Sequence, residues 1–249
     1  YEPDNGATSW IFNIRCDVTF HNGKTLTADD VIATFNIHRG ADSISAAKGL
    51  AADIVDIRKD GDHRVIFDLS TSNADFPFIA SDYHFMIMAS NGDGLVNVNE
   101  HNNSTGGYEL TAFDAGVRAE FTRNPNYWKA DSAHFDDYTL LSVIDPTARQ
   151  SALLNGDVDS ADSIDPKTVK LLQRVPIVEI LETTGTQHYT FPMRLDVSPF
   201  DNFDLRMALK LAIDRGELVD KILLGHGVAG NDIPVNNVMP FFNHTIVQR

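Results

Sequence analysis

Residues 183–225 read TTGTQHYTFPMRLDVSPFDNFDLRMALKLAIDRGELVDKILLG, and two kinds of periodicity follow one another along this stretch. Residues 184–191 alternate small, polar and aromatic side chains, which is typical of a half-buried strand. Pro199 then interrupts the extended run. We therefore expect a strand that leads into a short linker.

Two helices are expected after this linker. Asp204 stands where an N-cap is required, and the apolar residues that follow it recur at helical spacing. Asp214 and Glu217 form the capping pair of a second helix, which Gly225 closes. A strand, a linker and a capped helix pair suit a passage between two lobes.

Four segments of the chain carry a resemblance to a known family. Residues 200–215, FDNFDLRMALKLAIDR, resemble a segment of the extracellular solute-binding proteins of peptide and nickel ABC importers, the group of the dipeptide- and oligopeptide-binding proteins. Residues 10–31, which contain VTFHNGKTLTADDV, match the family next. Residues 105–128, which begin TGGY and end RNPNYW, and residues 152–159, ALLNGDVD, complete the set in the family's order.

The resemblance implies an α/β (mixed α+β) fold class, as a fragment of a type II-like periplasmic-binding-protein fold with two lobes and an extra β-rich subdomain. Three parts are expected: a β-rich subdomain at 1–130, an α/β segment of lobe I at 131–197, and the start of lobe II at 198–249. Family members are about twice this length, so we interpret the chain as an internal piece that lacks most of one lobe.

The function implied by the resemblance is capture of a short peptide, or a similar small solute, for an ABC importer. The expected partners are that solute and the permease membrane subunits, the expected location is the periplasm, and the expected state is a monomer. No catalytic group, metal or cofactor is expected. Alternatives are a ligand-sensing module of a regulator, or a binder of nickel complexes, opines, sugars or haem within the same family.

Composition excludes some classes of protein. The 249 residues contain 20 Lys and Arg against 35 Asp and Glu, a formal net charge of −15. Such a surface repels phosphate backbones, which argues against nucleic-acid binding. The acidic surface either aids solubility or steers cationic ligands, and charge alone does not decide between these. No apolar run approaches the roughly 20 residues that span a bilayer.

Motifs for catalysis or cofactor binding are absent from the sequence or lie in the wrong context. Residues 225–230 fit the pattern GxGxxG, but they follow a predicted helix rather than a strand. Asp157, Asp159 and Asp162 lack the Gly and Glu of an EF-hand loop. Cys16 is the only cysteine and lies between Ile14 and Val18, so we expect a packed apolar side chain.

The first half of the chain is expected to be β-rich. Its predicted elements are a strand at 10–14 whose pattern continues at Val18 and Phe20, a helix from Thr27 to Gly40, and hairpins at 54–69 and 108–123. Residues 90–107, rich in Asn, Asp and Gly, are the candidate mobile loop.

The second half is expected to alternate strands and helices. A strand at 138–144 is so apolar that burial on both faces is expected. Helices are expected from Asp145 to Gly156 and at 165–172, with further strands at Val158, 177–181 and 187–191.

Two loops are candidates for a ligand site, because ligands bind α/β sheets beyond the strand ends and between lobes. The resemblance points to the same two places. Asp162 suits a cationic group, and His188 and Tyr189 offer stacking surfaces with polar tips. Alternatively, Asp162 caps the next helix, and Tyr189 or Phe191 faces the core. The candidate residues are Asp162, Ser163 and Ile164 in the first loop, and Gly185, Thr186, Gln187, His188 and Tyr189 in the second.

Three further residues are expected to be structural, and two positions depart from the family. Arg123, Tyr127 and Trp128 are expected to anchor the subdomain to the lobe. Gly107 stands where the family usually has Pro, and Pro192 removes a backbone donor from the predicted crossing strand. By resemblance, the charged anchors for peptide termini lie beyond residue 249, so the ligand stays open.

Overall fold

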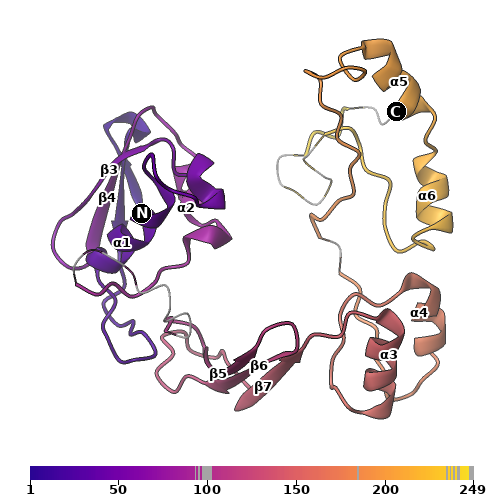
Figure 1. The fold of residues 1–249 in the computed structure, drawn as a ribbon, viewed down its shortest axis with the longest axis horizontal. Helices are drawn as coiled ribbons and strands as arrows, with labels where there is room; N and C mark the ends of the chain where they lie inside the picture. Colours follow the sequence, from indigo (N-terminus) through magenta and orange to yellow (C-terminus); the bar gives the residue numbers. More distant parts are fainter. Residues whose placement is uncertain are drawn as a thin grey trace. The chain divides into compact units, whose positions relative to one another are not determined.

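The computed structural model describes residues 1–92, 94, 96, 103–183, 185–233, 235, 237, 239 and 242–246. Two compact units make up the chain, Tyr1–Ser142 and Val143–Arg249 (Figure 1), and each is described by itself. The predicted parts 1–130, 131–197 and 198–249 concern the lobes of a complete fold and stay a prediction. Residues 93, 95 and 97–102 of the expected mobile loop at 90–107, and Thr184 of the expected crossing strand, lie outside the described residues.

A four-stranded antiparallel sheet forms the body of the first unit. Its strands are β1 (Glu2–Asp4), β2 (Ser9–Asn13), β3 (Ile54–Lys59) and β4 (Arg64–Leu69), in the order β1-β2-β4-β3. Gly61, at φ +76°, supplies the left-handed turn residue between β3 and β4. The predicted strand at 10–14 and the hairpin at 54–69 are thereby confirmed.

Helix α1 (Ala28–His38) begins with the predicted capping box. The Asp30 carboxylate accepts hydrogen bonds from the backbone N–H of Thr27 at 2.8 Å and from its hydroxyl at 3.0 Å. Gly40, at φ +94°, follows the end of the helix. Three short 3-10 segments and helix α2 (Phe76–Ala80) complete this part of the unit; the 3-10 segments are η1 (Asn5–Ala7), η2 (Ala46–Gly49) and η3 (Tyr83–Phe85).

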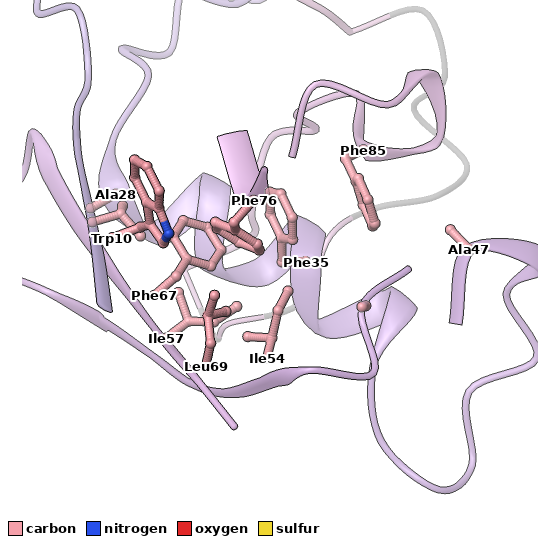
Figure 2. Packing of buried hydrophobic residues seen from close by; sticks show 12 residues of the cluster. Trp10, Ala28, Phe35, Ala47, Ile54, Ile57, Phe67, Leu69, Phe76 and Phe85 are labelled. Carbon is pink, nitrogen blue, oxygen red and sulfur yellow. The ribbon is translucent and has the colours of Figure 1, made fainter. Parts of the chain in front are cut away.

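Aromatic side chains from the sheet and its covering helices form the core (Figure 2). Phe35 on α1 stacks on Phe85, with ring centroids 4.7 Å apart, and meets Phe67 on β4 edge-on at 4.9 Å. Burial of each such ring stabilises the fold by about 1.5–3 kcal/mol. The buried hydrophobic members are Trp10, Ala28, Phe35, Ala47, Ala51, Ile54, Ile57, Val65, Phe67, Leu69, Phe76 and Phe85.

A three-stranded antiparallel sheet ends the first unit. Strands β5 (Tyr108–Asp114), β6 (Arg118–Arg123) and β7 (Asp137–Leu141) lie in sequence order, so the hairpin predicted at 108–123 is confirmed. The expectation that the strand at 138–144 is buried on both faces is wrong, because Leu140 and Leu141 are 56% and 50% exposed. Among the described strands, β7 is an edge strand that pairs with β6 alone.

The predictions for residues 16–20 were wrong in part. Strand β2 ends at Asn13 and the chain turns at Cys16, so this side chain is exposed rather than packed. Val18 and Phe20 are buried, at 3% and 1% exposure, but this stretch contributes only an isolated bridge between Thr19 and Thr25. Period-2 alternation was therefore a correct signal for burial and an incorrect one for strand.

Four helices lie in the described part of the second unit, and each has a side-chain cap. They are α3 (Pro146–Asn155), α4 (Pro166–Leu172), α5 (Phe203–Leu211) and α6 (Arg215–Lys221). The predicted helices after Asp145, Asp165 and Asp214 are confirmed, and each of these carboxylates accepts a first-turn N–H. Helix α5 starts earlier than predicted, because Asn202, not Asp204, accepts the Leu205 N–H at 3.1 Å.

The strands predicted at Val158, 177–181 and 187–191 are absent from the described residues of this unit. Ile177, Leu181 and Tyr189 are instead 80%, 81% and 82% exposed. An extended segment is stable as a strand only when a partner satisfies its backbone groups, and the described residues offer it none. The mixed α+β class holds for the whole chain, but its described strands all lie in the first unit.

Candidate functional site

The first candidate loop connects α3 to α4. Gly156, in the left-handed conformation at φ +78°, ends α3, and Asp165 caps α4 by accepting the Lys167 N–H at 3.0 Å. Between them, Asp162 and Ser163 are exposed and Ile164 is half-buried. The alternative that Asp162 caps the next helix is therefore wrong, because Asp165 performs this role.

One arginine connects this loop to the backbone in front of α3. The Arg149 Nη1 donates to the Val143 carbonyl at 2.9 Å, and its Nη2 donates to the Ser163 carbonyl at 3.2 Å. Ser163 itself has φ +50°, a left-handed conformation that is uncommon for residues other than Gly, Asn and Asp. The Arg149 guanidinium thus restrains the loop at Ser163, whose backbone conformation is strained.

The second candidate loop, residues 185–189, is exposed coil. Within it, the His188 Nδ1 donates to the Thr186 carbonyl at 3.0 Å. Tyr189 and Phe191 are 82% and 74% exposed, so the alternative that one of them faces the core is wrong. This loop presents an imidazole and a phenol to solvent, which can stack on a ligand and hydrogen-bond it.

The two loops are not joined by described polar contacts. No hydrogen bond or ion pair between described residues links 162–164 to 187–189. Glu182, which precedes the second loop, instead contacts His226, whose Nδ1 lies 3.0 Å from the Glu182 carboxylate. The structure therefore places each loop at the surface of the second unit, and their convergence on one ligand stays a prediction.

In the described part of the chain, no three His, Cys, Asp or Glu side chains gather as a metal-ligand set. Residues 225–230, the GxGxxG match, follow α6, and the described residues after them form no helix that could support a dinucleotide phosphate. Nor does any helix within the described ranges have the length and apolar character that crossing a bilayer requires.

A second polar cluster, in the first unit, was missed by sequence reasoning. The Asp30 side chain is fully buried and pairs with the Lys24 ammonium, while the Ser90 N–H donates to it at 2.7 Å. Burial raises the pKa of Asp30, but the hydrogen bonds from Lys24, Ser90 and Thr27 outweigh it and hold this pKa below its usual range. The pair thus fastens Ser90 to the start of α1.

The turn at 105–108 is fixed by three side chains of the same unit. The Gly106 carbonyl accepts hydrogen bonds from His21 Nε2 and from the buried Asn124 amide, both at 3.0 Å. The Tyr127 ring lies so close to Gly107 that a Cβ there would be 3.2 Å from it. Two of the segments quoted from the sequence, 10–31 and 105–128, therefore contact each other at this turn.

Arg123, Tyr127 and Trp128, expected to anchor the subdomain to the lobe, make their described contacts inside the first unit. Arg123 pairs with Asp136, and Trp128 lies under the Arg15 guanidinium at 4.7 Å from the ring centroid. These contacts suit a structural role, which stays a prediction, as does a link to a second lobe.

With this geometry in place, comparison with known proteins is informative. The family model for bacterial extracellular solute-binding proteins, family 5 (middle), matches residues 1–249. The chain belongs to this family. The resemblance drawn from the four sequence segments is confirmed.

Family 5 members of known sequence include two peptide-binding relatives. The periplasmic oligopeptide-binding protein OppA of Haemophilus influenzae is 26% identical, covering 86% of this chain and 44% of its own length. Di/tripeptide-binding protein 1 of Pseudomonas aeruginosa is 24% identical, covering 93% of this chain and 48% of its own. The chain thus spans about half the length of the curated family 5 relatives it matches.

A solved family 5 structure shows the same fold. NikZ from Campylobacter jejuni, in complex with Ni(L-His), superposes with a TM-score of 0.78 at 20% identity, covering 90% of this chain and 45% of that one. The match confirms the predicted fold class, a fragment of a periplasmic-binding-protein fold with mixed α and β structure.

The residues that sequence reasoning missed share a cause. Arg149 stands in the first half of a predicted helix with no local signal that its partner lies 14 residues later. Lys24 and Asp30 lie six residues apart, but Ser90 completes their cluster from 60 residues further along. Capping-box spacing could have indicated that Asp30 is buried; nothing in the sequence marks Arg149, Lys24 or Ser90.

Proposed function

We propose that this chain is part of the substrate-binding component of an ABC importer that captures short peptides or a similar small solute. The observation that carries the proposal is the family 5 match over residues 1–249, supported by two peptide-binding relatives. Two lobes close around the solute, and the closed form docks on the permease membrane subunits in the periplasm. The protein acts as a monomer, without catalysis or cofactor.

The proposed ligand-contacting residues are those of the two exposed loops of the second unit. Asp162 receives a cationic group such as a peptide amino terminus, and His188 and Tyr189 stack on side chains or bond main-chain groups. The remaining residues proposed to line this ligand site are Ser163, Ile164, Gly185, Thr186 and Gln187. In this proposal the parts 1–130, 131–197 and 198–249 are subdomain, lobe I and the beginning of lobe II.

The test is ligand binding by the complete gene product. Calorimetry with trialanine, alanyl-phenylalanine and the nickel–histidine complex distinguishes peptides from metal complexes, the ligand kind seen in NikZ. A peptide with micromolar Kd, about −8 kcal/mol, supports the proposal. Residues 1–249 alone should bind none of the probes tightly, because half of a cleft supplies half of the contacts. Binding of the nickel complex alone would redirect the assignment within the family.

Variants locate the site. Tyr189→Ala should weaken peptide binding about tenfold, whereas Tyr83→Ala, which removes an equally exposed aromatic side chain from the first unit, should leave it unchanged. Peptide hydrolysis by the purified protein would contradict the proposal. Genes for a permease and an ATPase beside the complete reading frame would support it, and a fused DNA-binding domain would point to a regulator instead.

A further inference from the structure

Arg149 ties together two backbone segments that are separated by α3. Its Nη1 holds the Val143 carbonyl at 2.9 Å and its Nη2 holds the Ser163 carbonyl at 3.2 Å. The side chain is half-buried. Its bond to the Val143 carbonyl is partly shielded from water, where a charged donor is more effective, whereas its bond to the Ser163 carbonyl is exposed. One guanidinium therefore fixes a distance between the entry to the helix and the loop behind it.

The loop needs such a restraint at the residue where Arg149 acts. Ser163 has φ +50°, a left-handed conformation that a serine adopts only when its surroundings hold it there. On the far side, the Asp165 carboxylate anchors the chain to α4. Residues 162–164 are thus restrained at Ser163 by Arg149 and immediately afterwards by a helix cap.

We propose that Arg149 is a positioning residue that keeps the 162–164 loop in the shape that presents Asp162 to a ligand. This rests on the proposed function, because it takes that loop to line the solute site. Only a planar fork of donors reaches both carbonyls at once; a lysine ammonium on its flexible stem holds one of them. Arg149→Lys therefore keeps the charge and removes the double restraint.

The first experiment needs no ligand. Hydrogen exchange of backbone amides is measured in the complete gene product, as wild type, Arg149→Lys and Arg149→Ala. The backbone N–H groups of Lys167 and Thr168 donate to Asp165, which directly follows the loop, and they should exchange about tenfold faster in both variants, the equivalent of one charge-assisted hydrogen bond. Guanidinium added well below denaturing concentration should restore slow exchange in Arg149→Ala.

A matched control is Arg215→Lys. Arg215 also spans two partners, the Gly230 carbonyl at 2.7 Å and Asp232 at 2.5 Å, but away from the loop. This variant should leave exchange at 167 and 168 unchanged. Equal acceleration throughout α3 and α4 of Arg149→Lys would show a general loss of stability and overturn the positioning role, as would unchanged exchange throughout.

The second experiment measures trialanine affinity in the same variants. Arg149→Lys should weaken binding about tenfold at an unchanged unfolding temperature, and Arg215→Lys should not. If the wild type binds trialanine and Arg149→Lys binds equally well, the inference is wrong while the proposed function stands. If exchange at 167 and 168 rises as expected but the wild type binds no probe, the restraint by Arg149 is supported and the proposed function fails.

Discussion

The buried Asp30 carboxylate connects three parts of the first unit. It joins the first turn of α1, Lys24 and Ser90, and its side chain is inaccessible to solvent. Removing one partner of such a cluster leaves the other polar groups buried without a hydrogen-bond partner, which costs their full desolvation free energy.

Asp30→Asn should therefore lower the free energy of unfolding at pH 7 by about 2–3 kcal/mol. Because the folded pKa of Asp30 is depressed, its stabilisation is complete above the ordinary aspartate value of 3.8 and disappears as pH falls through the folded pKa. Urea unfolding between pH 7 and pH 3 should show wild type and variant converging in acid.

The adjacent Asp29 provides the control. It lies in the same helical turn but is half-exposed, and its ion pair with Lys59 is a surface pair at 2.7 Å. Asp29→Asn should cost less than about 1 kcal/mol. Equal effects of the two substitutions would contradict the role assigned to the buried cluster.

Gly107 is a second residue with a specific steric requirement. A Cβ at this position would lie 3.1 Å from the Ala133 Cβ and 3.2 Å from the Tyr127 ring. Gly107→Ala should destabilise the protein by about 1–3 kcal/mol, as overpacking does. Gly106→Ala is the control in thermal unfolding, since its Cβ meets the Ser104 hydroxyl at an ordinary 3.4 Å. If Gly106→Ala destabilises the protein more than Gly107→Ala does, neighbouring side chains move to accept the Cβ at 107, and the steric prediction is wrong.

At the scale of elements, helix ends were the most predictable feature of the chain. A cap depends on a side chain and an N–H two or three residues later, so Asp145, Asp165 and Asp214 could be read from local sequence. Asn202 and Asp204 are both acceptable caps, and local sequence did not distinguish them. Hairpins were equally accessible, because a turn residue such as Gly61 fixes the register of both strands.

The cap of α6 offers a direct measurement. The Asp214 carboxylate accepts the Glu217 N–H at 2.9 Å, so Asp214→Ala should destabilise the second unit by about 1 kcal/mol. Asp220, exposed and near the C-terminal end of the same helix, opposes the helix dipole. Asp220→Ala should therefore be neutral or slightly stabilising in urea unfolding followed by circular dichroism; a loss equal to that of Asp214→Ala would argue against the cap.

Strands of the second unit could not be predicted from the same kind of local signal. The runs at 177–181 and 187–191 have the composition of strands, but pairing depends on partners distant in the sequence. Among the described residues they remain coil and expose their apolar side chains. The candidate site had a similar limit: local sequence predicted the two loops, whereas the Arg149 contact with the first loop and the left-handed conformation of Ser163 depend on the folded structure.

For the molecule as a whole, the first unit has paired strands where the second has exposed coil, and this difference predicts where proteases cut first. Arg194 has an exposed side chain in coil, whereas Arg58 and Lys59 have exposed side chains in a paired strand. Brief trypsin digestion, followed by mass spectrometry, should show cleavage after Arg194 before cleavage after Arg58 or Lys59. Arg194→Gln should remove that early fragment. Simultaneous cleavage at all three would mean that β3 opens as readily as the coil.

The placement of β2 at the interior of its sheet has a kinetic consequence. This strand is synthesised before β3 and β4, yet it pairs with β4, and the Trp10 indole N–H donates to the Asn73 carbonyl 63 residues further along. The β3–β4 hairpin closes locally and quickly, so it forms a template to which the waiting N-terminal strand is added. In a Trp128→Phe background, Trp10 fluorescence should therefore change after hairpin amides become protected; the reverse order would show that β2 becomes ordered before the β3–β4 hairpin.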